Sequence, residues 1–400
     1  TPPKETEDTM AVENIYFRPS PTSNISERLN SDDVQLKERP FLADSKAPYF
    51  PEHLNPEVNS DFPKVFHLDQ AKHPSDNLIK ATRKLIDTHL PTYGCLVLRG
   101  LPLNNHSDSD HSLSFSDLLQ QLGYQLTRYV GGVTARKQSG FMVYPASDED
   151  ARVCMDLHQD NTYWPEPPKQ LFFYYEQPAK VGGLNPLLDM REYLNKIPPD
   201  IVKKFESLGV RYENYYPDQS LDSRLAPWQK SFETNDRNVV ENNLNAGGFE
   251  FTWEKDKSAK TYSLRKWNVL SPFKQHPITS EKLWVNMIVA NHASYFHDHP
   301  SYPELMNRPY TVEGEKNINY PFNIKYGNGE SIPYSIIQTL RGLAWETARS
   351  FKPQAGDLLV VDNYRTQHGR LGYEPPRKFW IGISLGFFGV IVVLLVLLVL

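Results

Sequence analysis

Histidine and aspartate residues spaced like metal ligands are the feature of this 400-residue chain that could carry chemistry. His-x-Asp occurs at 67–69, 106–108 and 158–160, and His-Asp-His occurs at 297–299. On a strand, residues i and i+2 point to the same side, so one strand end can present an imidazole and a carboxylate to a single ion. The copies at 67–69, 106–108 and 297–299 lie in polar stretches and are interpreted as exposed loops.

The pair formed by His158 and Asp160 has a different context. The segment NTYWPEPP follows it, and then come the apolar run QLFFYYE at 170–176 and two consecutive glycines. Far along the chain, the run GDLLVVDN leads to His368. Two imidazoles and one carboxylate can hold a non-haem iron ion while leaving positions open for substrates. These three residues are therefore a candidate iron triad, and on this pattern alone a purely structural histidine competes with it.

The elements that would position the triad follow from hydrophobic periodicity and turn signals. Helices are predicted from about 77 to 86 and at 115–122, 190–197, 198–208 and 334–349. Strands are predicted at 93–98, 170–176, 249–253, 260–264, 283–289, 358–361 and 379–385. Many strands far apart in sequence, with helices inserted between them, predict a mainly β fold built as a double-stranded jelly roll. No boundary divides residues 61–385, so one domain is predicted there, after an extended or partly disordered arm at 1–60.

Charge and cysteine content narrow the functional class. The formal net charge is -5 and there is no long basic run, which argues against nucleic-acid binding. Two cysteines, Cys95 and Cys154, cannot form a disulfide framework, and the polar N-terminus has no apolar signal sequence, so a cytoplasmic location is predicted. Cys154 lies close to His158 and could be a fourth ligand, but an inert, half-buried thiol is the simpler interpretation.

The C-terminal run from 381 to 400 carries no charge and follows Arg377 and Lys378. This is the pattern of a membrane anchor. If the last strand occupies 379–385, the remaining segment 386–400 would cover roughly 22 Å as a helix, against a hydrocarbon layer about 30 Å thick. The hydrophobic tail at 386–400 is therefore interpreted as a short anchor, an interfacial or self-associating segment, or a gene-model artefact. Membrane association through it is an expectation, and the oligomeric state is left open.

Several motifs occur in an order that resembles a known family. They are YVGG (129–132), LHQDNTYWPEPPKQLFFYYEQP (157–178), VGG (181–183), WVN (284–286), YGNGESIP (326–333), GDLLVVDNYRTQHGR (356–370) and PPRK (375–378). Together they make the stretch from about 93 to 385 similar to the TauD/TfdA superfamily of iron(II)/2-oxoglutarate-dependent dioxygenases, and most of all to its clavaminate-synthase-like branch. The resemblance implies a double-stranded β-helix core with Fe(II) held by His158, Asp160 and His368.

The resemblance also implies the reaction. In this family 2-oxoglutarate chelates the metal, O2 takes the remaining position, and oxidation of the substrate is coupled to formation of succinate and CO2. The expected substrate is a small polar or amino-acid-like metabolite, most often hydroxylated. Two alternatives remain: a catalytically inactive metal-binding or membrane-tethered protein of the same fold, or a hydrolytic zinc enzyme that uses the same triad.

The cosubstrate residues are expected near the end of the domain. The far carboxylate of 2-oxoglutarate needs a charge-assisted, preferably bidentate partner, and the resemblance places it at Arg377, with Lys378 as the alternative. Arg365 and Arg370 are interpreted as structural or solvated. Asn185 stands where the family often has a threonine that touches the cosubstrate. An amide can still donate and accept hydrogen bonds, so binding would be altered rather than lost.

Three further residues are expected to line the substrate pocket: Asn286, Tyr163 and Tyr129. Asn286 matches a family position near the substrate. The competing interpretation is that all three are packing residues, because a tyrosine in a β-rich core usually has a structural role.

Overall fold

The computed structural model describes residues 10–12, 15–19, 61–69, 76–103, 113–127, 142–147, 149–255, 261–297 and 299–385. Most of the predicted arm at 1–60 and the hydrophobic tail at 386–400 lie outside these residues. In the part of the chain that is described, no helix is both long enough and apolar enough to cross a membrane.

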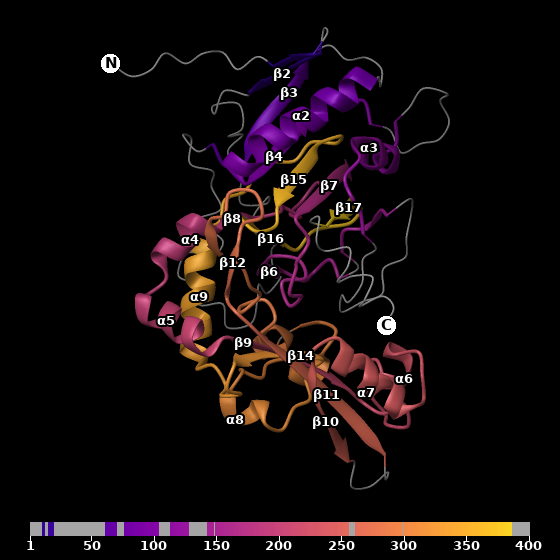
Figure 1. Ribbon diagram of the computed structural model, residues 1–400, viewed down its shortest axis with the longest axis vertical. Helices are drawn as coiled ribbons and strands as arrows, with labels where there is room; N and C mark the ends of the chain where they lie inside the picture. Colours follow the sequence, from indigo (N-terminus) through magenta and orange to yellow (C-terminus); the bar gives the residue numbers. More distant parts are fainter. Residues whose placement is uncertain are drawn as a thin grey trace.

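An eight-stranded, mostly antiparallel sheet is the largest layer of the molecule (Figure 1). Its strands, in spatial order, are β1 (Met10–Val12), β2 (Ile15–Pro19), β3 (Lys64–Asp69), β4 (Cys95–Arg99), β15 (Leu358–Asp362), β7 (Gln170–Gln177), β17 (Lys378–Ser384) and β5 (Tyr144–Pro145). Helices α2 (Asp76–Tyr93) and α3 (Phe115–Leu122) cover one face. A three-stranded sheet of β6 (Met155–His158), β16 (Thr366–Arg370) and β8 (Leu187–Asp189) carries the candidate iron site.

Strand β7 shows why the sequences of the central strands are continuously apolar. Successive side chains of a strand point to opposite faces. Phe172 and Tyr174 pack in the cluster beneath α2 and α3, whereas Phe173 and Tyr175 pack in a second cluster on the other face. Both faces of the sheet are covered, so the strand has no polar side.

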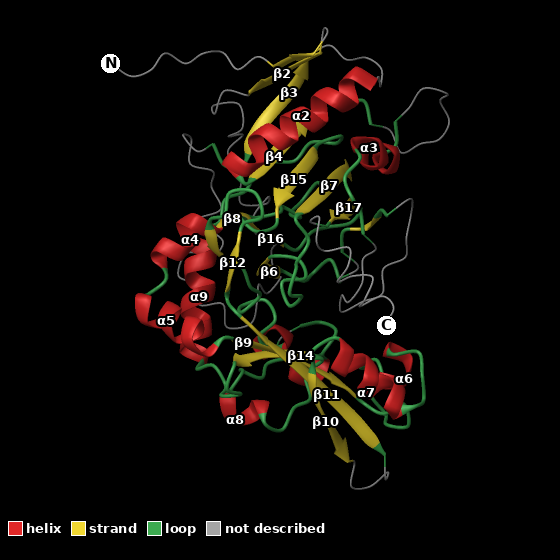
Figure 2. Cartoon of the chain, viewed as in Figure 1, coloured by secondary structure: helices red, strands yellow, loops and turns green. Residues whose placement is uncertain are grey.

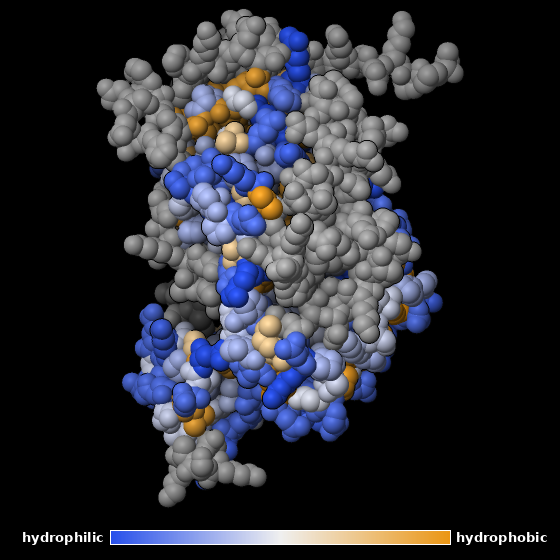
Figure 3. Space-filling model, turned by 180° about the vertical axis from the view of Figure 1, so that it is seen from behind, coloured by the Kyte–Doolittle hydropathy of each residue, from blue (hydrophilic) through white to orange (hydrophobic). Residues whose placement is uncertain are grey.

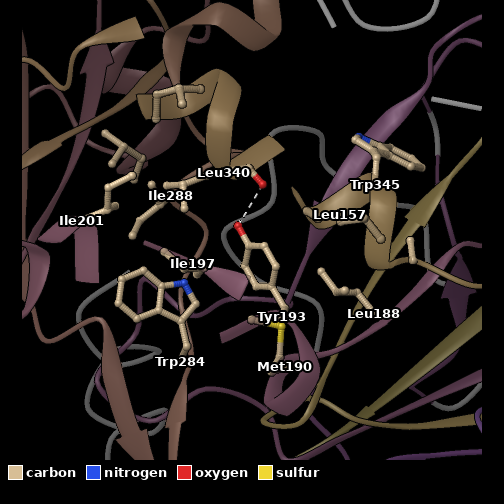
Figure 4. Packing of buried hydrophobic residues seen from close by; sticks show 14 of the residues in the cluster. Leu157, Leu188, Met190, Tyr193, Ile197, Ile201, Trp284, Ile288, Leu340 and Trp345 are labelled. Atoms are coloured by element: carbon tan, nitrogen blue, oxygen red, sulfur yellow. Dashed lines mark hydrogen bonds between the residues drawn. The ribbon is translucent and has the colours of Figure 1, made fainter. Parts of the chain in front are cut away.

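The remaining elements form a second region (Figure 2). It contains a sheet in the order β10 (Glu250–Lys255), β11 (Tyr262–Leu270), β9 (Val210–Tyr216) and β14 (Phe322–Tyr326), and the pair β12 (Phe273–Gln275) and β13 (Lys282–Trp284). Its helices are α4 (Met190–Lys196), α5 (Pro199–Leu208), α6 (Trp228–Ser231), α7 (Arg237–Ala246), α8 (Val312–Glu315) and α9 (Tyr334–Thr347), with 3-10 turns at Ala293–Phe296 and Pro303–Leu305. Figure 4 shows the core between α4, α5 and α9, where the Tyr193 hydroxyl donates to the Leu340 carbonyl.

Short elements with strong local signals were predicted well. Helix α3 begins after Ser114, whose side chain and that of Asp117 form a capping box. Helix α5 has Pro199 at its first position. The predicted hairpin at 249–264 is confirmed by the antiparallel pairing of β10 with β11.

The predicted strand at 283–289 is wrong beyond Trp284, because β13 ends there. The backbone N–H of Val285 donates to the Pro272 carbonyl, and the side chain of Asn286 accepts from the N–H of Ile288. The first bond continues the pairing by one residue, and the second is a local contact within 286–288, where the chain leaves the sheet.

The fold is therefore mixed, with helices and several antiparallel sheets; the predicted jelly roll and the domain limits at 61 and 385 stay predictions. The surface seen in Figure 3 is mostly hydrophilic where its residues are described, with scattered hydrophobic areas.

Candidate metal centre

Strand pairing brings the two candidate histidine ligands together. Strands β6 and β16 are antiparallel, and His368 is the register partner of His158. Their ring centroids are 4.4 Å apart. Asp160 is not on the strand, as the i, i+2 argument assumed, but in the turn after β6, beside Asn161 with its positive φ of 54°.

Three possible ligand atoms converge at this point. Asp160 Oδ1 lies 3.4 Å from His158 Nε2 and 3.9 Å from His368 Nε2. All three ligand atoms lie within 4.8 Å of one another, and no other set of three His, Cys, Asp or Glu residues in the described chain does this. The arrangement matches the two-histidine, one-carboxylate face that non-haem Fe(II) requires, with the opposite side left for substrates.

A backbone contact orients His158. Its Nδ1 lies 2.7 Å from the carbonyl oxygen of Asp156. A carbonyl can only accept, so Nδ1 carries the proton and Nε2 is left to bind a metal. The ring of His368 packs against Phe173, at 5.0 Å between centroids.

The loop after β15 holds the turn that carries Asp160. The backbone N–H of Asp160 donates to Asn363 Oδ1 at 2.8 Å, and Asn363 Nδ2 donates to the carbonyls of Asp160 and Pro168, both at 2.9 Å. Gln159 Nε2 donates to the Tyr364 carbonyl at 2.9 Å. These bonds explain why two motifs far apart in sequence are needed to place one carboxylate.

A small cavity, partly open to solvent, extends from the triad. Its apolar wall includes Met155, Phe173, Phe379 and Ile381. Outside the triad, its polar lining includes Asn185, Arg370 and Arg377.

Arg377 is a cation without an acidic partner among the described residues. Its Nη2 donates to Asn185 Oδ1 at 2.9 Å, its guanidinium lies 4.3 Å from the centroid of the Phe379 ring, and its buried Nε has no hydrogen-bond partner. Burial lowers the pKa of the guanidinium to about 10, so it remains charged near neutral pH. A desolvated guanidinium with an unused donor fits a carboxylate ligand.

Asn185 holds Arg377 in a fixed orientation. Its Oδ1 also accepts from the Tyr175 hydroxyl at 2.9 Å, and its Nδ2 donates to the Gly369 carbonyl at 2.9 Å. Both ends of the amide are therefore engaged, with the oxygen toward the guanidinium. Lys378 instead points outward, and its Nζ lies 3.0 Å from a carboxylate oxygen of Glu176.

Two glycines let the turn at 181–183 pack against the segment that carries Arg377. Gly182 has a φ of +69°, and a Cβ there would lie 2.3 Å from the Gly372 carbonyl oxygen. A Cβ on Gly183 would lie 3.1 Å from Tyr373 Cβ and 3.4 Å from Arg377 Cδ. The close approach requires residues without a side chain.

The other two arginines have structural partners. Arg370 donates to the Ser147 hydroxyl at 3.1 Å and to backbone carbonyls at 149, 150 and 153, which ties that loop to β16. Arg365 forms an ion pair with Glu281 and donates to the Thr279 hydroxyl at 3.2 Å.

The predicted substrate residues do not line this cavity where they are described. Asn286 Nδ2 donates to the Pro272 carbonyl at 3.3 Å, and the Tyr163 hydroxyl donates to Asn161 Oδ1 at 2.8 Å. Tyr129 lies outside the described residues, and substrate roles for all three stay predictions.

Cys154 is buried outside the triad, and burial raises the pKa of its thiol.

The interpretation of the other histidine motifs as exposed loops is wrong where they are described. His67 lies on strand β3. His297 and His299 are 4% and 5% exposed. His297 Nε2 lies 2.8 Å from the Tyr320 hydroxyl, so distant aromatic residues cover this polar segment. The motif at 106–108 lies outside the described residues.

Sequence reasoning missed Phe173, Asp156 and Arg341 as residues that support the site. Arg341 lies in the buried, otherwise mostly apolar stripe of helix α9. A charged residue in such a stripe indicates a buried partner, which was the available signal.

Comparison with known proteins places this geometry in a family. The model of the TauD, TfdA family of taurine catabolism dioxygenases matches residues 64–381, and the chain belongs to this family. The protein is therefore an Fe(II)- and 2-oxoglutarate-dependent dioxygenase with an intact His-Asp-His triad. The donor set of the triad fits Fe(II), and the buried guanidinium of Arg377 fits the dicarboxylate cosubstrate.

Two relatives illustrate the match within this family. The chain is 27% identical over 298 residues to the dapdiamide synthesis protein DdaC of Enterobacter agglomerans, covering 74% of this chain and 84% of the relative. It is 26% identical over 310 residues to a clavaminate synthase-like protein of Arabidopsis thaliana, covering 75% and 84%.

Solved structures match more weakly. PvcB of Pseudomonas aeruginosa aligns with a TM-score of 0.43 and 10% identity over 80% of this chain and 85% of PvcB. AAD-2 in complex with Mn(II) and N-oxalylglycine aligns with a TM-score of 0.41 and 14% identity over 80% and 93%.

Proposed function

We propose that this protein oxidises, in the simplest case hydroxylates, a small polar or amino-acid-like metabolite while 2-oxoglutarate and O2 are converted to succinate and CO2. The observation that supports this most is that the triad and Arg377 line one cavity. His158, Asp160 and His368 would hold Fe(II), and Arg377, oriented by Asn185, would pair with the far carboxylate of the cosubstrate.

Each residue has a separate task in this proposal. Bound Fe(II) supplies the activation of O2. Asp160 is a carboxylate ligand, which argues against halogenation because a halide usually needs that position vacant. The apolar wall of Phe173, Phe379 and Ile381 limits water around the cosubstrate. Asn185, where the family often has threonine, is compatible with cosubstrate binding, since its amide oxygen accepts from the Arg377 guanidinium.

Two further points support the finer parts of the proposal. The three-stranded sheet with the triad lies against β7 of the large sheet through the contact of His368 with Phe173, which supports a double-stranded β-helix core. One relative is named for dapdiamide synthesis, which supports a metabolite rather than a macromolecule as substrate.

An anaerobic titration tests the proposal. Fe(II) and then 2-oxoglutarate are added to the full chain, and the metal-to-ligand charge-transfer band is recorded; succinate is measured after O2 is admitted. We expect a band that is lost in His368→Ala and kept in His297→Gln, a buried histidine outside the triad. No band with the folded wild-type protein would contradict the proposal, and a band without succinate would support the inactive alternative. Zinc in the purified protein, with no band, would support the hydrolytic one.

A further inference from the structure

Asp156 lies two residues before His158, and its carboxylate is buried between two side chains of helix α9. Asp156 Oδ2 accepts from Arg341 Nε at 2.7 Å, and Oδ1 accepts from Trp345 Nε1 at 2.9 Å. The side chains of Asp156 and Arg341 are each 1% exposed. Both oxygens are thus occupied by donors that lie one helical turn apart on the same helix.

Stability alone does not explain this pair. Removing a carboxylate and a guanidinium from water costs about as much free energy as their attraction returns, so an apolar pair of the same size would serve a core equally well. The ion pair and the indole contact fix the orientation of the Asp156 side chain, because two donors bind its planar carboxylate. Arg341 is itself held by a bond from its Nη2 to Ser294 Oγ at 3.0 Å.

The backbone carbonyl of Asp156 connects this buried pair to the metal centre. The carbonyl oxygen of Asp156 is the 2.7 Å partner of His158 Nδ1. Trp345 also packs in the core cluster that contains Leu157, the residue between them on β6 (Figure 4). Helix α9 therefore binds the side chain of Asp156 and shares a core cluster with Leu157, on the strand that ends at the ligand.

We propose that Arg341, Trp345 and Asp156 are positioning residues for the iron site. The two donors fix the side chain of Asp156 and through it the orientation of the Asp156 carbonyl. That carbonyl accepts from His158 Nδ1, which keeps Nε2 directed at the position shared with Asp160 and His368. None of the three touches the metal. This inference rests on the metal-binding part of the proposed function and adds the residues that set the affinity and geometry of the metal.

Metal binding by the full chain tests the inference without relying on turnover. The double variant Asp156→Asn/Arg341→Met removes both charges together, so that neither is left buried alone. We expect anaerobic Fe(II) or Co(II) affinity to fall by up to about 10- to 100-fold, the range for complete loss of an outer-shell partner of a metal-bound histidine, and the absorption spectrum of bound Co(II) to change. Trp345→Phe keeps the ring but removes one donor, and a several-fold loss is expected.

Leu340→Ala is the matched control, since it removes core packing beside Arg341 on the same helix but leaves all of these bonds in place. It should be less stable yet bind Co(II) with the wild-type affinity and spectrum. Wild-type affinity and spectrum in a folded double variant would overturn the inference, and so would unchanged binding by Trp345→Phe if the double variant does not fold. The wild-type charge-transfer band reports on the proposed function, whereas the ratio of variant to wild-type metal affinity reports on these three residues.

Discussion

Replacing Arg377 with methionine should separate cosubstrate binding from metal binding. The guanidinium lines the cavity, is held by Asn185, and has no acidic partner among the described residues. Truncating one partner of a buried, hydrogen-bonded charge pair costs roughly 2–5 kcal/mol. Each 1.4 kcal/mol is a factor of ten, so the Kd for 2-oxoglutarate should rise by about 30-fold to several thousand-fold. Fe(II) affinity should stay unchanged, because Arg377 is not a ligand.

Lys378→Met is the control for that variant. Lys378 is 50% exposed and pairs with Glu176, and an exposed ion pair contributes about 0–1 kcal/mol. Because Lys378 does not line the cavity, the Kd for 2-oxoglutarate should change by less than about fivefold. The assay is the anaerobic titration of the Fe(II)-loaded variants with 2-oxoglutarate, followed by the charge-transfer band and by calorimetry.

Unfolding measurements test whether Arg377→Met loses 2-oxoglutarate binding only because the variant is unfolded. Removing a buried cation that lacks an acidic partner should not destabilise the chain, apart from about 1 kcal/mol for the lost bond to Asn185. Wild-type cosubstrate affinity in Arg377→Met, or a larger loss in Lys378→Met, would refute the assignment.

Three other perturbations follow from the geometry. Asn185→Ala should lower the free energy of unfolding by about 1–3 kcal/mol in urea titrations and weaken 2-oxoglutarate binding, because the amide has buried partners at both ends. Gly182→Ala should destabilise by about 1–3 kcal/mol more than Gly356→Ala, because both have positive φ but only the first Cβ would meet a backbone oxygen; equal losses would show that the close approach is not real. Burial raises the pKa of Asp357 to about 6, so the native state binds this proton more tightly than the unfolded chain. Stability should fall by up to about 3 kcal/mol as pH rises from about 4 to 6, and this component should be absent in Asp357→Asn when urea unfolding is compared across that range.

Residues with local signals could be predicted, and residues whose role depends on distant partners could not. Helix α3 could be predicted because its hydrophobic periodicity is local, and the structure shows that its capping residues are local too. The interpretation of His297 and His299 as exposed was wrong, because only the fold shows that they are buried, His297 against the distant Tyr320. A polar segment has the same local sequence whether or not another part of the chain packs on it.

The cosubstrate residues show the same division. Arg377 and Lys378 are adjacent and both basic, and the order of motifs placed the cosubstrate partner at this pair without choosing between them. The choice depends on which side chain faces the cavity. Arg377 lies just before β17 and Lys378 is its first residue, and only the tertiary structure shows that Arg377 lines the cavity whereas Lys378 pairs with Glu176.

The sequence by itself determined the chemical types of the three ligands, their order along the chain, the family, and most of the elements that carry them. The tertiary structure alone decided that Asp160 lies in a turn held by Asn363, that His158 presents Nε2, and that Arg341 pairs with Asp156. The physical reason is separation along the chain: Arg341 and Asp156 are 185 residues apart, and Asp160 and Asn363 are 203 residues apart. Contacts at such distances depend on burial and strand register, which local periodicity does not encode.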